Sequence, residues 1–322
     1  MIDLTPALKR VAEARRFVSR VNGEDDKDHT EKLSEMELRT KVIKIRAGIE
    51  AVANTPLSER TSPFIPLTSE ERAVMRWQIA PYIENGQVFL PNNKSEIQTI
   101  LDTLFIDGVC GETIVAGQIF RDTAIKLYER MAQQLFQVAD CEATDIICVS
   151  PWRAGLAGAR GLWQAGVHSF AHLGCSRNHD TLKTAVYYAN WPQNMPVNPT
   201  VAITDKMLAS GETFITVIKW ILEQGISQDK ILIHAAVAVP EGIDKILHQF
   251  PEVKLFTASI QSGLNRLGYI EGLALGDAGD KIWNYDMNLQ IGTELFVEPG
   301  IITESELQFI LDRTQVKQAA HS

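Results

Sequence analysis

The sequence lacks a long apolar segment, paired cysteines and an excess of basic residues. No apolar run approaches the about 18 residues that a membrane-spanning helix needs. The four cysteines include no C-x-x-C pair, so the sequence predicts neither a zinc knuckle nor a disulfide framework. The 31 basic residues are outnumbered by 40 acidic ones, and the net charge of −9 argues against a nucleic-acid surface built on general positive charge.

We also expect no secretory signal, because the residues from Met1 to Thr5 reach charged side chains at once and lack an apolar core. We therefore expect a cytoplasmic protein with no membrane partner. What is present is a chain of 322 residues, 45% of them hydrophobic, which is enough to bury a sizeable core. Since this length exceeds the about 150 residues typical of one domain, we expect one large or two smaller compact units.

Apolar residues at helical spacing predict two amphipathic helices before residue 55, separated by a charged loop at Gly23 to Asp28. A link rich in Pro, Ser and Thr follows, from Thr55 to Pro66. After it, Thr68-Ser69-Glu70-Glu71 has the spacing of a helix capping box. We therefore expect residues 1–77 to form a helical N-terminal extension.

The middle of the chain alternates helical and strand-like segments. A helix is predicted over about 112–139, and short continuous apolar runs follow at 145–149, 201–204, 231–237 and 253–257. Continuous runs suit strands that are buried on both faces by helices. The predicted fold class is therefore α/β, with an open, mostly parallel sheet flanked by helices. Ligands of such sheets bind beyond the carboxyl ends of the strands.

The predicted strand at 201–204 is followed by an acid, a loop of small residues and a helix start. Loop amides between Ala209 and Thr213 can converge on a phosphate, and the helix adds its positive dipole end. Asp205 suits a sugar hydroxyl or a metal ion beside that phosphate. The same spacing occurs where Ser210 or Thr213 merely caps the helix, so spacing alone leaves both interpretations open.

Two arginines lie near other predicted strands. Arg153 follows the strand ending at Val149, and Arg177 lies in a predicted polar loop before an alternating ribbon at 183–188. A fixed guanidinium suits a pyrophosphate oxygen, although a lone arginine is more often in a surface ion pair. Farther along, 268–280 is rich in glycine and alanine, which lets the backbone approach a flat ligand, although a turn-rich connector would look similar.

In this order the segments resemble the uracil phosphoribosyltransferases, which are type I phosphoribosyltransferases. The shared motifs fall within about 146–283 and are Arg-Ala-Gly-Leu at 153–156, the Arg177 loop, Asp-x-Met-Leu-Ala-Ser-Gly at 205–211, Val-Pro-Glu-Gly-Ile at 239–243, Thr-Ala-Ser-Ile at 257–260, Gly-Tyr-Ile at 268–270 and Gly-Asp-Ala-Gly-Asp at 276–280. The resemblance implies a β-ribbon hood at about 182–200 that covers the site. It also implies a transferase-like domain at 78–286, between the extension at 1–77 and a C-terminal extension at 287–322.

The resemblance implies that uracil and phosphoribosyl pyrophosphate (PRPP) react to give uridine monophosphate and pyrophosphate, a pyrimidine salvage reaction. Mg²⁺ would arrive bound to PRPP, without a direct protein ligand. The implied catalytic residues are Asp205 for the ribose hydroxyls, Arg153 and Arg177 for pyrophosphate, and Asp277 near the ribosyl diphosphate. The implied phosphate-binding residues are Lys206, Met207, Leu208, Ala209, Ser210, Gly211, Glu212 and Thr213, and the implied base-binding residues are Tyr269, Ile270, Gly276 and Ala278. The family likeness further implies a homo-oligomer, at least a dimer, that binds no nucleic acid.

The chain departs from the family pattern at Lys206, Glu212 and Gln261. In the base segment it has five residues, Glu271 to Leu275, where the family has four that include a proline. Two alternatives to uracil transfer therefore stay open. One is a phosphoribosyltransferase for another base, and the other is a regulatory protein that binds PRPP or uridine monophosphate without turnover.

Overall fold

The protein is described here by a computed structural model, which covers residues 4–30, 33–54, 68–110, 115, 117–177, 184–264, 270–271, 275 and 281–282. The chain divides into two compact units, Met1–Asn284 and Tyr285–Ser322. The C-terminal extension expected at 287–322 lies outside the described residues. All elements named below belong to the first unit.

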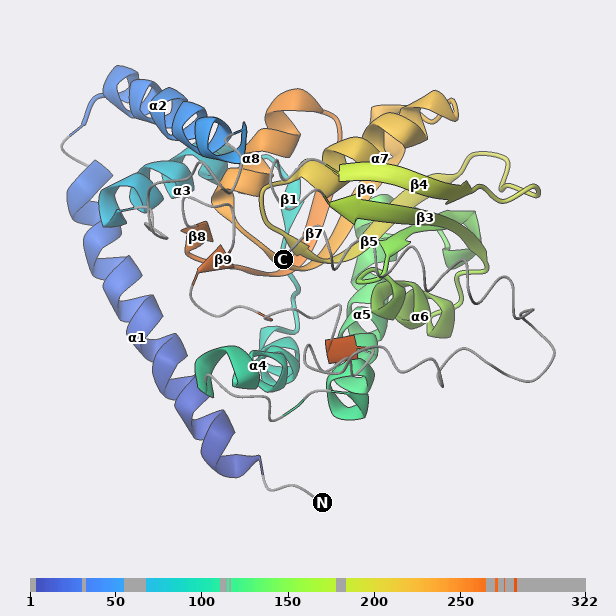
Figure 1. The fold of residues 1–322 in the computed structure, drawn as a ribbon, viewed down its shortest axis with the longest axis horizontal. Helices are drawn as coiled ribbons and strands as arrows, with labels where there is room; N and C mark the ends of the chain where they lie inside the picture. The colour runs from blue at the N-terminus through green and yellow to red at the C-terminus, as the bar shows by residue number, and fades with distance from the viewer. Residues whose placement is uncertain are drawn as a thin grey trace, which may run out of the picture. The chain divides into compact units, whose positions relative to one another are not determined.

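A seven-stranded sheet with the order β1-β7-β6-β5-β2-β3-β4 forms the centre of this unit (Figure 1). Its strands are β1 (Val88–Phe89), β2 (Ile146–Trp152), β3 (Ser169–Arg177), β4 (Thr184–Asn190), β5 (Thr200–Leu208), β6 (Ile231–Ala238) and β7 (Lys254–Ile260). Neighbouring strands are parallel except for the antiparallel pair β3 and β4. The predicted mostly parallel α/β sheet is confirmed, and the predicted ribbon is the β3–β4 pair.

Helices cover both faces of the sheet, which explains why its central strands are continuously apolar. Along β5, Val201 and Ile203 join one hydrophobic cluster and Ala202 joins the other. The helices α4 (Lys94–Cys110), α5 (Gln118–Ala139) and α6 (Leu156–Gln164) belong to the cluster of Ala202, whereas α7 (Glu212–Glu223) and α8 (Pro240–Gln249) belong to that of Val201. Figure 1 shows these two groups of helices on opposite sides of the sheet. The prediction of strands buried on both faces is therefore confirmed.

Three helices precede the first strand: α1 (Thr5–Thr30), α2 (Glu35–Asn54) and α3 (Ser69–Glu84). The predicted charged loop at 23–28 is wrong, because α1 continues through it. One glycine costs a helix only about 1 kcal/mol relative to alanine, and the segment contains no proline to break it. The predicted capping box is confirmed: the Thr68 hydroxyl accepts a hydrogen bond from the Glu71 N–H, and the Glu71 carboxylate accepts one from the Thr68 N–H.

These N-terminal helices pack within the same compact unit as the sheet. Helix α3 contacts α8, and α1 contacts both α3 and α4. The expected boundary between the extension and the transferase-like domain, at residue 78, stays a prediction. Among the helices of the described ranges, none has the combination of length and hydropathy that would let it cross a membrane.

A buried ion pair connects α2 to α8. Arg46 donates hydrogen bonds of 2.5 and 2.6 Å to the two carboxylate oxygens of Asp244. The Asp244 side chain is fully buried, and that of Arg46 is 28% exposed. Because a buried carboxylate without a cation is costly, the position of α8 depends on α2 although the two residues are 198 positions apart.

Replacing Arg46 with alanine should therefore lower the free energy of unfolding by about 3 kcal/mol, because it leaves the Asp244 carboxylate buried and unpaired. The matched control is Arg39→Ala on the same helix, which removes an exposed pair with Glu35 at 2.7 Å. That control should cost less than about 0.5 kcal/mol. Urea denaturation of the full chain measures both values, and equal losses would contradict the assigned importance of the buried pair.

Candidate functional site

The predicted phosphate loop joins β5 to α7. Strand β5 is longer than predicted and ends at Leu208, so Asp205 lies within a strand and the turn is confined to Ala209–Gly211. Gly211 has φ of +82°, in the left-handed region where glycine has no Cβ penalty. The chain therefore passes from strand to helix within one short turn, and the first amides of α7 have no carbonyl partner within the helix. Such amides, next to a small-residue turn, can bind a phosphate.

Helix α8 supports this loop from behind. A Cβ atom at Gly242 would lie 2.1 Å from the carbonyl oxygen of Ala209, so only glycine permits this approach. The Val239 N–H donates a hydrogen bond of 3.1 Å to the carbonyl oxygen of Leu208. Glu212, one of the departures from the family pattern, forms an ion pair with Lys245 of α8. Both ends of the turn are thus attached to α8 or to Val239 directly before it.

Asp205 is half-buried on β5. Its Oδ1 accepts a hydrogen bond of 2.7 Å from the backbone N–H of Lys206. Burial raises the pKa of Asp205 to about 6, against the opposing effects of the Lys206 charge and of that N–H. The positive charge at Lys206, another departure from the family pattern, therefore favours the ionised form of Asp205.

Tyr128 of α5 also belongs to this site, although no sequence motif pointed to it. Its hydroxyl donates a hydrogen bond of 2.5 Å to the backbone carbonyl oxygen of Asp205. Burial raises the pKa of Tyr128 well above its usual range, so the phenol stays a donor. The sequence does place Tyr128 on the apolar face of a predicted helix. A tyrosine buried there needs a hydrogen-bond partner for its hydroxyl, and this requirement could have indicated its role.

The loop with Arg153 follows β2 and lies against β5. The Trp152–Arg153 peptide bond is cis, and the Arg153 side chain is exposed. A Cβ atom at Gly155 would lie 2.4 Å from the carbonyl oxygen of Thr204, the residue before Asp205. The structure therefore brings the Arg153 loop and Asp205 to the same edge of the sheet.

Arg177 is the last residue of β3, so the prediction that it lies in a loop is wrong. The antiparallel pairing with β4 continues the strand to this point and places Thr184 opposite Arg177. The Thr184 hydroxyl lies 3.2 Å from that of Thr213 at the start of α7. The backbone of Arg177 thus lies near the phosphate loop, while its side chain is outside the described residues.

Of the four residues assigned to the base, Ile270 lies in the described part of the chain. It belongs to β9 (Ile270–Glu271), which pairs with β8 (Gly263–Leu264), and it stands opposite Leu264. The remaining assigned residues of this region lie outside the described residues: Tyr269, Gly276 and Ala278 for the base, and Asp277 for catalysis. Their roles stay predictions.

No group of three His, Cys, Asp or Glu side chains is placed to hold a metal ion in the ranges that the structure covers. Mg²⁺ in phosphate-processing sites is commonly held by one or two carboxylates together with substrate oxygens. A half-buried carboxylate at Asp205, beside the phosphate loop, fits such a substrate-borne ion.

The raised pKa of Asp205 predicts a cost to stability that depends on pH. Between its ordinary value of 3.8 and about 6, the folded protein keeps a proton that the unfolded chain has released, so stability falls as pH rises through this window. Asp205→Asn removes this cost. The gain in free energy of unfolding should be about 1–2 kcal/mol larger at pH 7.5 than at pH 4. Denaturation at both pH values tests this, with Asp122→Asn on the exposed side of α5 as control, and an equal or smaller gain at pH 7.5 would contradict it.

Comparison with known proteins agrees with this geometry. Residues 115–284 match the sequence profile of the family described as uracil phosphoribosyltransferase. The uracil phosphoribosyltransferase of Brucella anthropi is 40% identical over 113 residues, which is 35% of this chain and 52% of that protein. That of Campylobacter fetus is 37% identical over 116 residues, which is 36% of this chain and 54% of that protein. The chain thus spans about half the length of the curated relatives that it matches.

A solved structure matches a larger part of the chain. The AQ2163 protein from Aquifex aeolicus is 25% identical, with a TM-score of 0.54, and the match covers 62% of this chain and 99% of that one. The matched profile covers more than half of the 322 residues and includes β2, the phosphate loop and α8. On these grounds the chain belongs to the uracil phosphoribosyltransferase family.

Proposed function

We propose that this protein transfers the phosphoribosyl group of PRPP to uracil, giving uridine monophosphate and pyrophosphate. The observation that supports this most directly is the meeting of three segments at one edge of the sheet. The Gly155 contact brings the Arg153 loop to Thr204, and the Thr184 hydroxyl brings the end of β3 to Thr213. Family membership supports the same reaction.

In this reaction N1 of uracil forms a bond to C1 of the ribose while the bond from C1 to the pyrophosphate oxygen breaks. Pyrophosphate leaves with the electron pair of the broken bond, and the N1 proton of uracil passes to solvent. Positive charge develops at C1, so the site has to orient the two substrates and stabilise the departing anion. Bound Mg²⁺ would neutralise part of the charge on the diphosphate.

Different residues of this chain would bind different parts of PRPP. The amides of the turn and of the first residues of α7, at 209–213, would bind the 5-phosphate of the ribose, and Asp205 would accept hydrogen bonds from the ribose hydroxyls. Arg153 and Arg177 would bind the pyrophosphate oxygens, with Asp277 nearby. Lys206 supports the role of Asp205, because its charge opposes the rise in pKa caused by burial.

A different base is the second candidate. The segment from Glu271 to Leu275 has one residue more than the family pattern, and it falls between the assigned base residues Ile270 and Gly276. A change in the length of this segment alters the pocket more than it alters the phosphate loop. PRPP binding is therefore better supported than the identity of the base.

The test is release of pyrophosphate from PRPP and Mg²⁺, with uracil, cytosine, adenine, guanine, hypoxanthine and orotate in separate reactions. Release with uracil alone is the expected result. Release with another base alone would assign the specificity to that base. No release with any base, together with a thermal shift on addition of PRPP or uridine monophosphate, would indicate a binding protein without turnover.

Arg153→Ala should raise the KM for PRPP about tenfold or more and change the KM for uracil much less, because a guanidinium on the pyrophosphate contacts only the donor. The matched control is Arg160→Ala on α6, an exposed arginine that lies 3.9 Å over the ring of Trp163. It should leave both constants nearly unchanged. Equal changes in the two KM values of Arg153→Ala would remove Arg153 from the pyrophosphate subsite.

Family membership also supports two predictions that concern the whole protein. We expect a homo-oligomer of at least two copies and a cytoplasmic location. Analytical ultracentrifugation of the full chain measures the first, and fractionation of cells that express the protein measures the second.

A further inference from the structure

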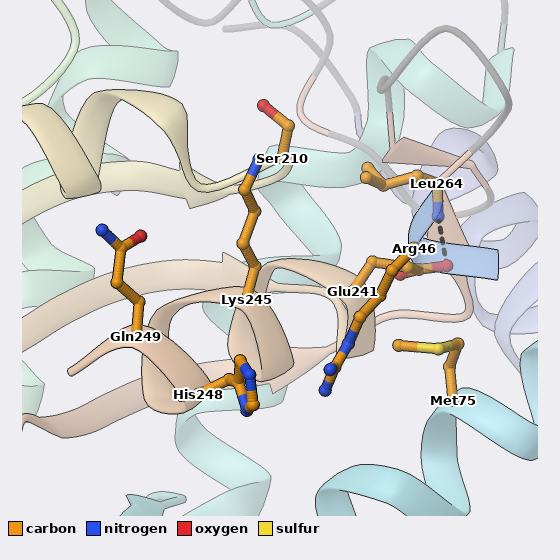
Figure 2. Close-up of a pocket in the computed structure, with 8 residues that line it drawn as sticks. All are labelled: Arg46, Met75, Ser210, Glu241, Lys245, His248, Gln249 and Leu264. Atoms are coloured by element: carbon orange, nitrogen blue, oxygen red, sulfur yellow. Dashed lines mark hydrogen bonds between the residues drawn. The ribbon is translucent and has the colours of Figure 1, made fainter. Parts of the chain in front are cut away.

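The first turn of α8 contacts both parts of the proposed site. Gly242 lies against the carbonyl oxygen of Ala209 in the phosphate loop. The residue before it, Glu241, accepts a hydrogen bond of 3.2 Å at Oε1 from the backbone N–H of Leu264, drawn as a dashed line in Figure 2. Two adjacent residues of one helix thus contact two segments that are more than 50 residues apart in the sequence.

Leu264 is the partner of a residue assigned to the base. It belongs to β8, and β8 pairs with β9 so that Leu264 stands opposite Ile270 and Gly263 stands opposite Glu271. A Cβ atom at Gly263 would lie 2.7 Å from the same oxygen of Glu241, so the carboxylate is packed directly against β8. This two-stranded pair links the Ile270 backbone to Glu241 through Leu264.

The chemistry of Glu241 is unusual for a residue that only fills space. The residue is 6% exposed, and its Oε2 is buried without a hydrogen-bond partner among the described residues. Burial raises the pKa of Glu241 to about 7, opposed by its hydrogen bonds and by Arg72 and Arg76 of α3. An apolar side chain of similar volume would avoid this cost of burial. What the carboxylate adds is an acceptor for the Leu264 N–H.

A cavity lies beside Glu241 and Leu264. The cavity has a volume of about 430 Å³. Its walls come from α2, α3, α8, β8 and the phosphate loop; the lining residues are Arg46, Met75, Ser210, Glu241, Lys245, His248, Gln249 and Leu264 (Figure 2). Leu264 is itself fully buried, so its backbone N–H has no access to water and the Glu241 carboxylate is the acceptor that satisfies it.

We propose that Glu241 is a positioning residue for the nucleobase: it holds the β8–β9 pair that includes Ile270, while Gly242 holds the phosphate loop. The first turn of α8 thereby sets the spacing between the base subsite and the ribose 5-phosphate subsite. The proposal rests on the proposed transferase function.

The experiment compares KM values for uracil and PRPP in three variants of the full chain. Glu241→Met keeps the volume and removes the acceptor, so the KM for uracil should rise about tenfold while that for PRPP changes less than about threefold. Glu241→Gln keeps an acceptor for the Leu264 N–H and should restore the KM for uracil to within about threefold of the original. Gly242→Ala should give the opposite split, because its Cβ atom displaces Ala209.

Two controls separate positioning from general damage. His248→Ala, on the exposed surface of α8 at the same cavity, should leave both KM values within about twofold. Thermal unfolding of each variant reports whether it folds, and Glu241→Ala replaces Glu241→Met if the latter does not. A parallel rise of both KM values in the Glu241 variant, or failure of Glu241→Gln to restore the KM for uracil, would overturn the proposal.

Calorimetric titration with uridine monophosphate applies the same test without turnover. Glu241→Met should bind this nucleotide at least about fivefold more weakly than the original protein, and Glu241→Gln should bind it as the original does. If the unsubstituted protein binds the nucleotide but releases no pyrophosphate, the proposed reaction is overturned, and the binding comparison between the variants still tests the role of Glu241. An original protein that neither binds nor reacts would overturn both proposals.

Discussion

Direct contact between backbone segments is the constraint on which the rest of this site depends. Gly155 allows the loop after β2 to touch the carbonyl oxygen of Thr204, and Gly242 allows α8 to touch that of Ala209. A single methyl group at either position would overlap a backbone oxygen, and backbone cannot turn away as a side chain can. At these two points the loop after β2 and the helix after β6 therefore contact β5 and its following turn through backbone atoms, at the edge of the sheet where the amides of that turn can face a phosphorylated ligand.

Two carboxyl groups, the half-buried Asp205 and the buried Glu241, add a second constraint. Burial raises the pKa of Asp205 to about 6 and that of Glu241 to about 7, so both are costly to ionise at neutral pH. Each nevertheless accepts a hydrogen bond from a backbone N–H, of Lys206 and Leu264 respectively. Such groups are typical of sites where binding, rather than stability, requires the polar atom.

The N-terminal helices contribute to this arrangement from the side of α8. Helix α3 packs on α8, and Arg46 of α2 binds the buried Asp244 of α8. Lys245 of α8 forms an ion pair with Glu212, and the first turn of α8 contacts both the phosphate loop and β8. A change in the packing of α2 or α3 against α8 would therefore shift both the phosphate loop and β8, because α8 contacts both of them.

Patterns within short segments were sufficient to predict much of this protein. The apolar runs predicted four strands of the parallel sheet, the Thr68–Glu71 spacing predicted a capping box, and the residues from 201 onward predicted a strand followed by a short loop and a helix start, because each pattern depends on residues within a few positions of one another. Tertiary structure decided the rest. The hydrogen bond from Tyr128 to Asp205, the pair of Arg46 with Asp244 and the bond between Glu241 and Leu264 join residues 77, 198 and 23 positions apart. No local pattern encodes such contacts, since they arise only when helices and strands pack against one another.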